Sequence, residues 1–230
     1  MMQFYRVNLN TCAQARGAVV VIDVLRAFTT AGYLFEAGVK EIVLTSTVEE
    51  ALKLRQQMPG SLLLGEIDGI PIPGFDLGNS PSELSRYDLR GKTVIQRTTA
   101  GTQGVVRCLH AENILTAALT NARATATYLE RLAPREITFV LTGYFPDEGW
   151  GDEDVACADV LEAYLQNRPI DWQEIDQRVR HSRSGKHYDG TREAFPPPDL
   201  DMALAVNRFP FAMRVEKKDG LPVLQTVPVD

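Results

Sequence analysis

Four short segments concentrate carboxylate, hydroxyl and guanidinium side chains in a chain of otherwise ordinary composition. They are IDVLRAFTT (22–30), GEIDGIPIPGFDLGNSP (65–81), IQRTTAGTQG (95–104) and GWGDEDVACA (149–158). Carboxylate and carbonyl oxygens are the ligands that Mg²⁺ prefers, and arginine binds phosphate and carboxylate groups. The four segments together therefore predict phosphate-ester chemistry assisted by a hard cation.

The first segment places Asp23 at the end of an apolar run and Arg26 at the turn into a helix. The carboxylate could hold a cation or attack phosphorus, and the arginine could clamp an anionic group. A structural alternative is an acid favoured by the helix dipole, with an ordinary ion pair. Haloacid-dehalogenase phosphatases need a second Asp two residues after the first, and Leu25 stands there, which excludes that class.

The second segment ends in a pattern typical of a helix start. Ser80 as N-cap, Pro81 as first helical residue and Glu83 two residues later predict a capping box. Other oxygen donors in the segment have no such explanation: Glu66, Asp68, Asp76 and Asn79. We expect them to hold a metal ion or the substrate. The alternative is a solvated loop with Asx-turns.

In the third segment, hydroxyl groups surround a glycine where a strand is expected to meet a helix. A glycine-opened backbone with hydroxyls at a helix start is typical of a phosphate cradle. The residues concerned are Arg97, Thr98, Thr99, Gly101 and Thr102. The spacing and lysine of a nucleotide-binding phosphate loop are absent. An N-cap threonine without a ligand is the structural alternative.

The fourth segment brings three acids together at a helix start. Asp152, Glu153 and Asp154 repel one another, and a divalent cation would relieve that repulsion. Acids in a first helical turn are also stabilising by themselves, which is the alternative. Cys157 is expected to be a small buried residue rather than a nucleophile.

The elements that must position these groups alternate along the chain. Strands are expected at 5–9, 18–24, 41–45, 61–65, 92–96, 113–116 and 137–142, and helices at 27–37, 48–58, 102–110, 121–132 and 153–167. Strand–helix alternation with continuously apolar strands predicts a layered α/β domain with a mostly parallel sheet. Ligands of such sheets bind beyond the strand ends, where the four segments fall.

The C-terminal part has a different pattern. Residues 183–199 are polar, basic and end near three prolines, so we expect a long loop that acts as a lid. Residues 212–223 contain the Asp219-Gly220 pair of a β-hairpin turn. The chain is expected to be one domain, or two closely packed halves of about residues 1–117 and 118–230.

Composition limits the partners. The 230 residues carry a net charge of −6, which argues against a nucleic-acid binder. Three cysteines fit no disulfide or metal pattern, no signal peptide is recognisable, and the longest apolar run is too short to cross a membrane. We expect a cytoplasmic protein without a membrane or nucleic-acid partner; a homodimer is a possible assembly.

The motifs resemble those of the 2-phosphosulfolactate phosphatases, the ComB-like family, in order and spacing over about residues 4 to 226. The resemblance is carried by VVIDVLRAFTT, GE-DG-PIPGFDLGNSP, RTTAGT, GDEDVACA and NRFPFAMRVEKKDGLPVL. Members commonly carry Asn at the position of Ala100. A substrate that differs in detail is therefore an open alternative.

The resemblance implies a three-layer α/β/α fold and Mg²⁺-dependent hydrolysis of 2-phospho-3-sulfolactate to 3-sulfolactate and phosphate, a step of coenzyme M biosynthesis. The expected catalytic residues are Asp23, Arg26, Asp76 and Arg97. The expected phosphate- or substrate-binding residues are Asn79, Ser80, Thr98, Thr99, Gly101 and Thr102, and the expected metal ligands are Glu66, Asp76, Glu153 and Asp154. Two alternatives remain: a phosphatase for another 2-phospho acid, and a non-enzymatic module that binds phosphorylated metabolites.

Overall fold

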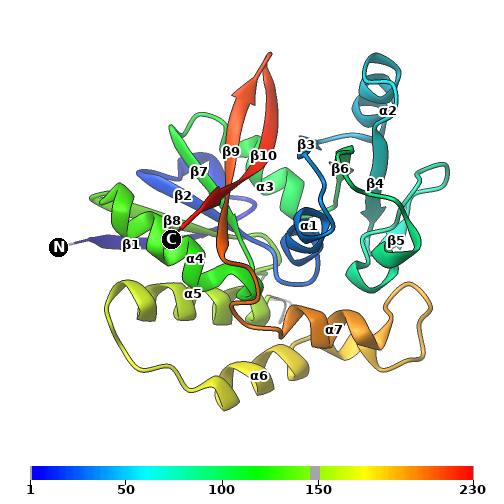
Figure 1. Ribbon diagram of the computed structural model, residues 1–230. Coiled ribbons are helices and arrows are strands. Elements are labelled where there is room, and N and C mark those ends of the chain that lie inside the picture. Colours follow the sequence, from blue (N-terminus) through cyan, green and yellow to red (C-terminus); the bar gives the residue numbers. More distant parts are fainter. Residues whose placement is uncertain (1, 146–150, 230) are drawn as a thin grey trace.

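Strands and helices alternate along most of the chain in the computed structural model, which describes residues 2–145 and 151–229 (Figure 1). The strands are β1 (Gln3–Asn8), β2 (Ala18–Ile22), β3 (Glu41–Thr45), β4 (Leu62–Ile67), β5 (Ile70–Pro71), β6 (Thr93–Arg97), β7 (Asn113–Ala117), β8 (Glu136–Leu141), β9 (Phe211–Lys218) and β10 (Leu221–Pro228). The α-helices are α1 (Ala27–Glu36), α2 (Val48–Gln57), α3 (Gly101–Arg107), α4 (Ala122–Leu132), α5 (Asp152–Leu165), α6 (Trp172–His181) and α7 (Pro197–Ala203). Short 3₁₀ turns are η1 (Cys12–Gln14), η2 (Pro81–Arg86), η3 (Leu119–Asn121) and η5 (Gly185–Tyr188).

Within the described residues, ten strands form a sheet in the order β1-β8-β2-β7-β9-β10-β3-β6-β4-β5. Neighbours are parallel from β1 to β7 and again from β3 to β4. The C-terminal hairpin lies between these two parallel blocks, because β9 pairs with β7 and β10 pairs with β3, both antiparallel. The mostly parallel α/β sheet and the hairpin are confirmed, and the hairpin is the central link of the sheet.

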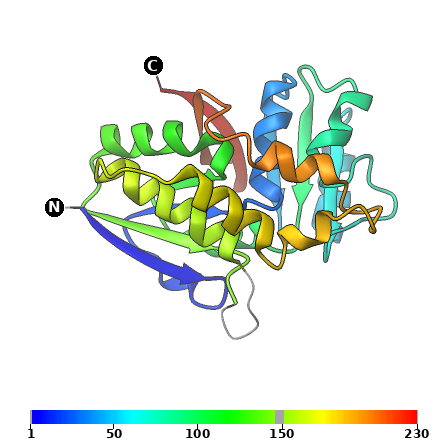
Figure 2. The same cartoon turned by 90° about the horizontal axis from the view of Figure 1, so that it is seen from below.

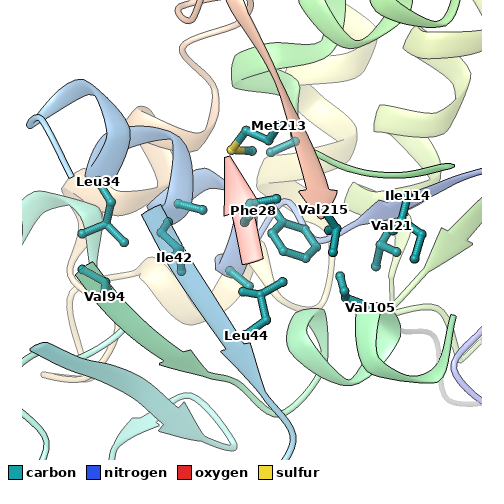
Figure 3. Packing of buried hydrophobic residues seen from close by; sticks show 14 of the residues in the cluster. Val21, Phe28, Leu34, Ile42, Leu44, Val94, Val105, Ile114, Met213 and Val215 are labelled. Atoms are coloured by element: carbon teal, nitrogen blue, oxygen red, sulfur yellow. The ribbon is translucent and has the colours of Figure 1, made fainter. Parts of the chain in front are cut away.

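Helices cover both faces of this sheet, as alternation along each strand requires. Along β2, Val19 and Val21 face a cluster with α1 and α3, whereas Val20 faces a cluster with α4 and α5. Figure 3 shows Phe28 of α1 near Val21 of one block and Leu44 of the other. The three-layer arrangement is therefore confirmed, and α1 packs against both parallel blocks.

The opposite face is covered by separate helices for the two blocks. On the first block, α4, α5 and α6 lie side by side, in green to dark yellow in Figure 2. On the second block, Ala51 and Leu54 of α2 pack on Val43 and Ile95. One face of the sheet therefore packs against α1. The other face packs against α4–α6 on the first parallel block and against α2 on the second.

Helix α6 is an element that the sequence analysis did not anticipate. Its N-cap is Asp171, whose Oδ1 accepts hydrogen bonds from the N–H groups of Gln173 and Glu174 at 3.0 and 3.1 Å. An acid at N-cap is a recognisable helix-start signal. The expected elements are all present, with ends within about three residues of their expected positions.

No helix of residues 2–145 and 151–229 is long and apolar enough to cross a membrane. Cys157 of α5 is buried, and burial raises its pKa well above the ordinary value, which agrees with a non-nucleophilic role. The division of the chain near residue 117 stays a prediction.

Candidate active site

A cavity of about 590 Å³ lies where four strands end. Asp23 follows β2, Glu66 is near the end of β4, Thr99 follows β6 and Thr142 follows β8, and all four line the cavity. The strands come from both parallel blocks of the sheet. This is the location at which α/β sheets usually bind ligands.

Asp23 is held by the first turn of α1. Its Oδ1 accepts the N–H of Ala27 at 2.9 Å, and the residue is only 7% exposed. Burial raises the pKa of Asp23 to about 7, with further contributions from the negative charges of Glu66 and Glu153. A glycine is required next to it, because a Cβ on Gly101 would lie 2.8 Å from Asp23 Oδ2.

Two further acids enter from the start of α5. Asp154 accepts the N–H of Val24 at 2.9 Å and the N–H of Gly143 at 2.8 Å, so it ties the ends of β2 and β8 together. Burial and the neighbouring charges of Glu153 and Asp23 raise the pKa of Asp154 well above its ordinary value. The pKa of Glu153 is also raised, first by burial, and its Oε2 is buried without a hydrogen-bond partner.

The fourth buried acid, Glu66, has a different environment. Its Oε1 accepts the N–H of Thr99 at 2.7 Å, and its Oε2 accepts the Thr99 hydroxyl at 3.0 Å and the N–H of Gly69 at 2.6 Å. Three donors therefore fix this carboxylate rigidly at the cavity wall. They join β4 to the turn after β6.

Arg26 also lines the cavity, and it is 5% exposed. Its Nη1 donates to Asp199 Oδ2 at 2.8 Å and its Nη2 donates to the carbonyl of Gly69 at 3.1 Å. The guanidinium lies over the rings of Phe195 and Tyr188, with its carbon 5.0 and 5.6 Å from the ring centroids. The site therefore contains a buried cation in a fixed position beside the four acids.

The segment between α6 and α7 completes the cavity wall, as the expected lid would. Ser184, His187, Tyr188 and Phe195 all line it. Burial and the charges of two nearby arginines lower the pKa of His187, and burial raises the pKa of Tyr188. The lid function itself stays a prediction.

The structure brings together about half of the residues expected from the sequence. Those that line the cavity are Asp23, Arg26, Glu66, Asp68, Asn79, Thr99, Glu153 and Asp154. Those that do not are Asp76, Ser80, Arg97, Thr98, Gly101 and Thr102. The start of the fourth segment, Gly149 and Trp150, lies outside the described residues.

Asp76 has structural partners away from the cavity. Its carboxylate is ion-paired with Arg55 of α2 and accepts the N–H of Leu63 at 2.8 Å. Arg97 donates to the backbone carbonyl of Glu66 at 2.8 Å from behind the cavity wall. These contacts brace β4, so neither residue is retained among the proposed metal-binding or catalytic groups.

The expected capping box at Ser80 and Glu83 is wrong. The Ser80 hydroxyl donates to Asp199 Oδ1 at 2.9 Å instead of capping η2, and Glu83 pairs with Arg86. The interaction with a carboxylate distant in sequence overrides the local pattern. Pro81 does begin the short 3₁₀ turn, as expected.

The expected phosphate cradle also has a different geometry. Thr98 and Thr102 hydrogen-bond each other reciprocally, with the N–H of Thr98 2.9 Å from Thr102 Oγ1 and the N–H of Thr102 3.0 Å from Thr98 Oγ1. Both side chains are buried and serve the start of α3. Of the hydroxyls in this segment, Thr99 faces the cavity, where it donates to Glu66.

The donor set of the cavity fits a hard cation. In residues 2–145 and 151–229, no group of three or more His, Cys, Asp or Glu side chains is arranged to hold a metal ion by itself. Mg²⁺, however, usually keeps several waters and needs only one or two carboxylates with substrate phosphate oxygens. The unpartnered Oε2 of Glu153, next to acids of raised pKa, is the atom best explained by such a cation.

Several cavity residues were not identified from the sequence. Thr142 and Gly143 directly follow the apolar run of β8, so the rule that sites follow strand ends would have found them. Tyr188 and Phe195 of the cavity wall, and Asp199 behind Arg26, come from the C-terminal segment, which has no local signal for its contacts with Arg26. Their roles depend on tertiary structure.

Comparison with known proteins shows which family the chain resembles over most of its length. Residues 5–195 match the family model described as 2-phosphosulpholactate phosphatase. A "Probable 2-phosphosulfolactate phosphatase" of Bacillus subtilis is 31% identical over 210 residues, which cover 90% of this chain and 91% of the relative. Proteins with the same name from Thermus thermophilus and Deinococcus radiodurans are 33% and 44% identical, over 90% and 70% of this chain and 87% and 66% of their own lengths.

Proposed function

Since the chain belongs to the 2-phosphosulpholactate phosphatase family, we propose that it is a Mg²⁺-dependent phosphoric monoester hydrolase for a small acidic substrate. The proposed reaction converts 2-phospho-3-sulfolactate and water to 3-sulfolactate and phosphate. The observation that carries the proposal is the cavity in which four buried carboxylates and one buried guanidinium meet. Acids alone would repel a phosphate ester, so the proposal requires a cation.

We assign the cation to Asp23 and Glu153. Asp23 uses Oδ1 to accept a backbone N–H, and Glu153 has a buried oxygen without a partner. Asp154 and Glu66 already accept two and three hydrogen bonds, which suits them to orient the site and to bind the ion through water. When bound, Mg²⁺ would supply positive charge to offset the charge of the phosphoryl group.

Arg26 is proposed to bind the phosphoryl oxygens. Its guanidinium is fixed by Asp199 and Gly69, and fixed donors stabilise developing charge without reorganisation during the reaction. The uncharged Asn79 amide at the same wall is proposed to bind the substrate.

In the hydrolytic step, a new bond forms between an attacking oxygen and phosphorus, and the ester bond to the substrate oxygen breaks. Besides holding the cation, Asp23 has two candidate roles, as nucleophile or as the base that takes a proton from water. The leaving alkoxide takes up a proton to become a hydroxyl group. An aspartyl-phosphate trapped in a single turnover would support the nucleophile, and its absence would support direct attack by water.

The test is phosphate release by the purified protein from 2-phospho-3-sulfolactate, with Mg²⁺ and with EDTA. We expect turnover that is lost in EDTA and restored by excess Mg²⁺. Full activity in EDTA would reject the metal dependence. Binding of the substrate without turnover, measured by calorimetry at saturating Mg²⁺, would instead support a non-enzymatic binding module.

A second substrate is included because of Ala100, which lines the cavity where relatives resembling this chain commonly carry Asn. Other 2-phospho acids, such as 2-phospholactate, are assayed beside 2-phospho-3-sulfolactate. A higher kcat/KM for one of these would assign a different substrate within the same reaction class.

A further inference from the structure

Asp199 is a buried acid that lies outside the four segments singled out from the sequence. It is in the first turn of α7 and is 0% exposed. Its Oδ1 accepts the hydroxyl of Ser80 at 2.9 Å and the N–H of Ser82 at 3.0 Å. Its Oδ2 accepts Nη1 of Arg26 at 2.8 Å. The carboxylate therefore joins α7, the start of η2 and the start of α1.

The guanidinium of Arg26 is held on its edge and on its faces. Asp199 and the carbonyl of Gly69 accept hydrogen bonds from its two Nη atoms, and the rings of Phe195 and Tyr188 pack against it. The stretch of chain from Tyr188 to Asp199 thus supplies both the charged partner and the packing. Figure 1 shows this C-terminal segment, in yellow to orange, running beneath α1.

Arg26 stands at the boundary of two hollows. It lines the candidate active-site cavity and also an adjoining cavity of about 680 Å³. Asn79, His187 and Phe195 line both as well. A change in the direction of the Arg26 side chain would therefore change the shape and the charge of the cavity that contains the four acids.

Stability alone is a poor explanation for such a pair. Removing two charges from water is energetically costly, and well-packed apolar residues often replace a buried ion pair with no loss of stability. The pair does, however, fix the orientation of a planar donor group that has a long and flexible stem. Orientation is what a residue that binds a transferring phosphoryl group needs.

We propose that Asp199 is a positioning residue of the active site, which acts through Arg26 to hold the guanidinium in the direction that binds the phosphoryl group. The proposal rests on the proposed phosphatase function. Asp199 itself does not touch the substrate. The competing role is a structural one, in which Asp199 only attaches α7 to Ser80 and Ser82.

The test compares Asp199→Asn with a matched control on the same helix. Asp201→Asn is the same chemical change at an exposed acid whose partner is Arg180, with 3.0 Å between Asp201 Oδ1 and Arg180 Nη2. We expect Asp199→Asn to lower kcat/KM by about 100-fold and to weaken inhibition by inorganic phosphate. Asp201→Asn should keep both constants within about twofold, as is usual for surface substitutions.

A double mutant separates positioning from structure. In an Arg26→Gln background, Asp199→Asn should cause no further loss of kcat/KM, because the residue through which Asp199 acts is gone. An unchanged effect in that background would overturn the proposal. So would normal kcat/KM and phosphate inhibition in Asp199→Asn together with a lowered melting temperature. If Asp199→Asn does not fold, Asp199→Glu, which keeps the charge but moves it, replaces it with the same expectations.

Failure of the phosphatase function is recognised separately. If the wild-type protein releases no phosphate from any ester, calorimetry with inorganic phosphate and Mg²⁺ replaces the kinetic assay. Weaker phosphate binding in Asp199→Asn than in Asp201→Asn would still support positioning. Equal binding in the two variants would overturn it.

Discussion

Replacing Asp23 by Asn should abolish most activity and at the same time stabilise the metal-free protein at alkaline pH. The carboxyl of Asp23 has a pKa of about 7 instead of the ordinary 3.8, because it is buried near Glu66 and Glu153. At 1.36 kcal/mol per pKa unit, the difference corresponds to about 4 kcal/mol. This is an upper limit, because the neighbouring acids can take up part of the protonation themselves.

The sign follows from the folded state holding its proton more tightly than the unfolded state. Below pH 3.8 the carboxyl is protonated in both states, so it has no effect on the free energy of unfolding. As pH rises toward about 7, the folded state either keeps the proton or buries a charge. The free energy of unfolding falls over this range, and the loss reaches its full value above about pH 7. Asn retains an oxygen that can accept the N–H of Ala27, so this hydrogen bond is expected to survive.

The assay is thermal unfolding in EDTA at about pH 8 and about pH 5, with wild type, Asp23→Asn and the exposed-site control Asp88→Asn. For a chain of this size, 1 kcal/mol changes Tm by roughly 2 to 4 °C, so the gain at the higher pH is up to roughly 8 to 16 °C. The gain should shrink at the lower pH, and Asp88→Asn should change Tm little at either pH. Excess Mg²⁺ should raise the Tm of wild type more than that of Asp23→Asn.

Two results would refute this reasoning. The first is a Tm of Asp23→Asn at or below that of wild type at about pH 8 in EDTA, because it would mean that the ionised carboxylate does not destabilise the folded state. The second is a gain that does not depend on pH, because an effect of packing rather than of charge would then be responsible.

Three other substitutions test the remaining parts of the site. Asp76→Asn weakens the ion pair with Arg55, so we expect the free energy of unfolding, measured by denaturant titration, to fall by about 1 to 3 kcal/mol. The value of kcat/KM should change little. A loss of activity without a loss of stability would restore Asp76 to the site. Glu66→Gln replaces an acceptor of three hydrogen bonds, including two from Thr99, and should lower both stability and kcat. A kcat equal to that of wild type would contradict the proposed role of Glu66 in orienting the site. Gly69→Ala places a Cβ 2.3 Å from the ring of Phe195, at a backbone φ of +81° that favours glycine. We expect a lower Tm in thermal unfolding and a higher KM in initial-rate measurements. Unchanged values would mean that the C-terminal segment can move aside at no cost.

The fold could be predicted from the sequence largely because its elements have strong local patterns. Continuously apolar strands such as β2 and β8 and the Asp219-Gly220 turn identified their elements without tertiary information. The position of the hairpin within the sheet could not be predicted in this way. It depends on the edges that β7 and β3 offer to the hairpin, and both partners are more than 90 residues away in sequence.

Within the candidate site, the residues most open to prediction from sequence are acids that cluster at one helix start. Glu153 and Asp154 lie at a helix start that points to a cavity, and their burial follows from the apolar helix behind them. In residues 65–81, by contrast, Glu66 and Asp76 are equivalent by sequence, since each is an acid in a turn-rich segment. Their roles differ because Arg55 of α2 reaches Asp76, whereas the turn after β6 brings two donors of Thr99 to Glu66.

The same contrast explains why the arginines could not be assigned from sequence. Arg26 follows β2 and Arg97 is the last residue of β6, and both could in principle bind an anion. Arg97 uses its guanidinium on the backbone of Glu66, while Arg26 meets Asp199 from 173 positions further along the chain. Arg26 is held in a fixed position at this cavity by an acid at the far end of the chain, so the proposed positioning role makes the C-terminal segment part of the candidate site together with the strand ends.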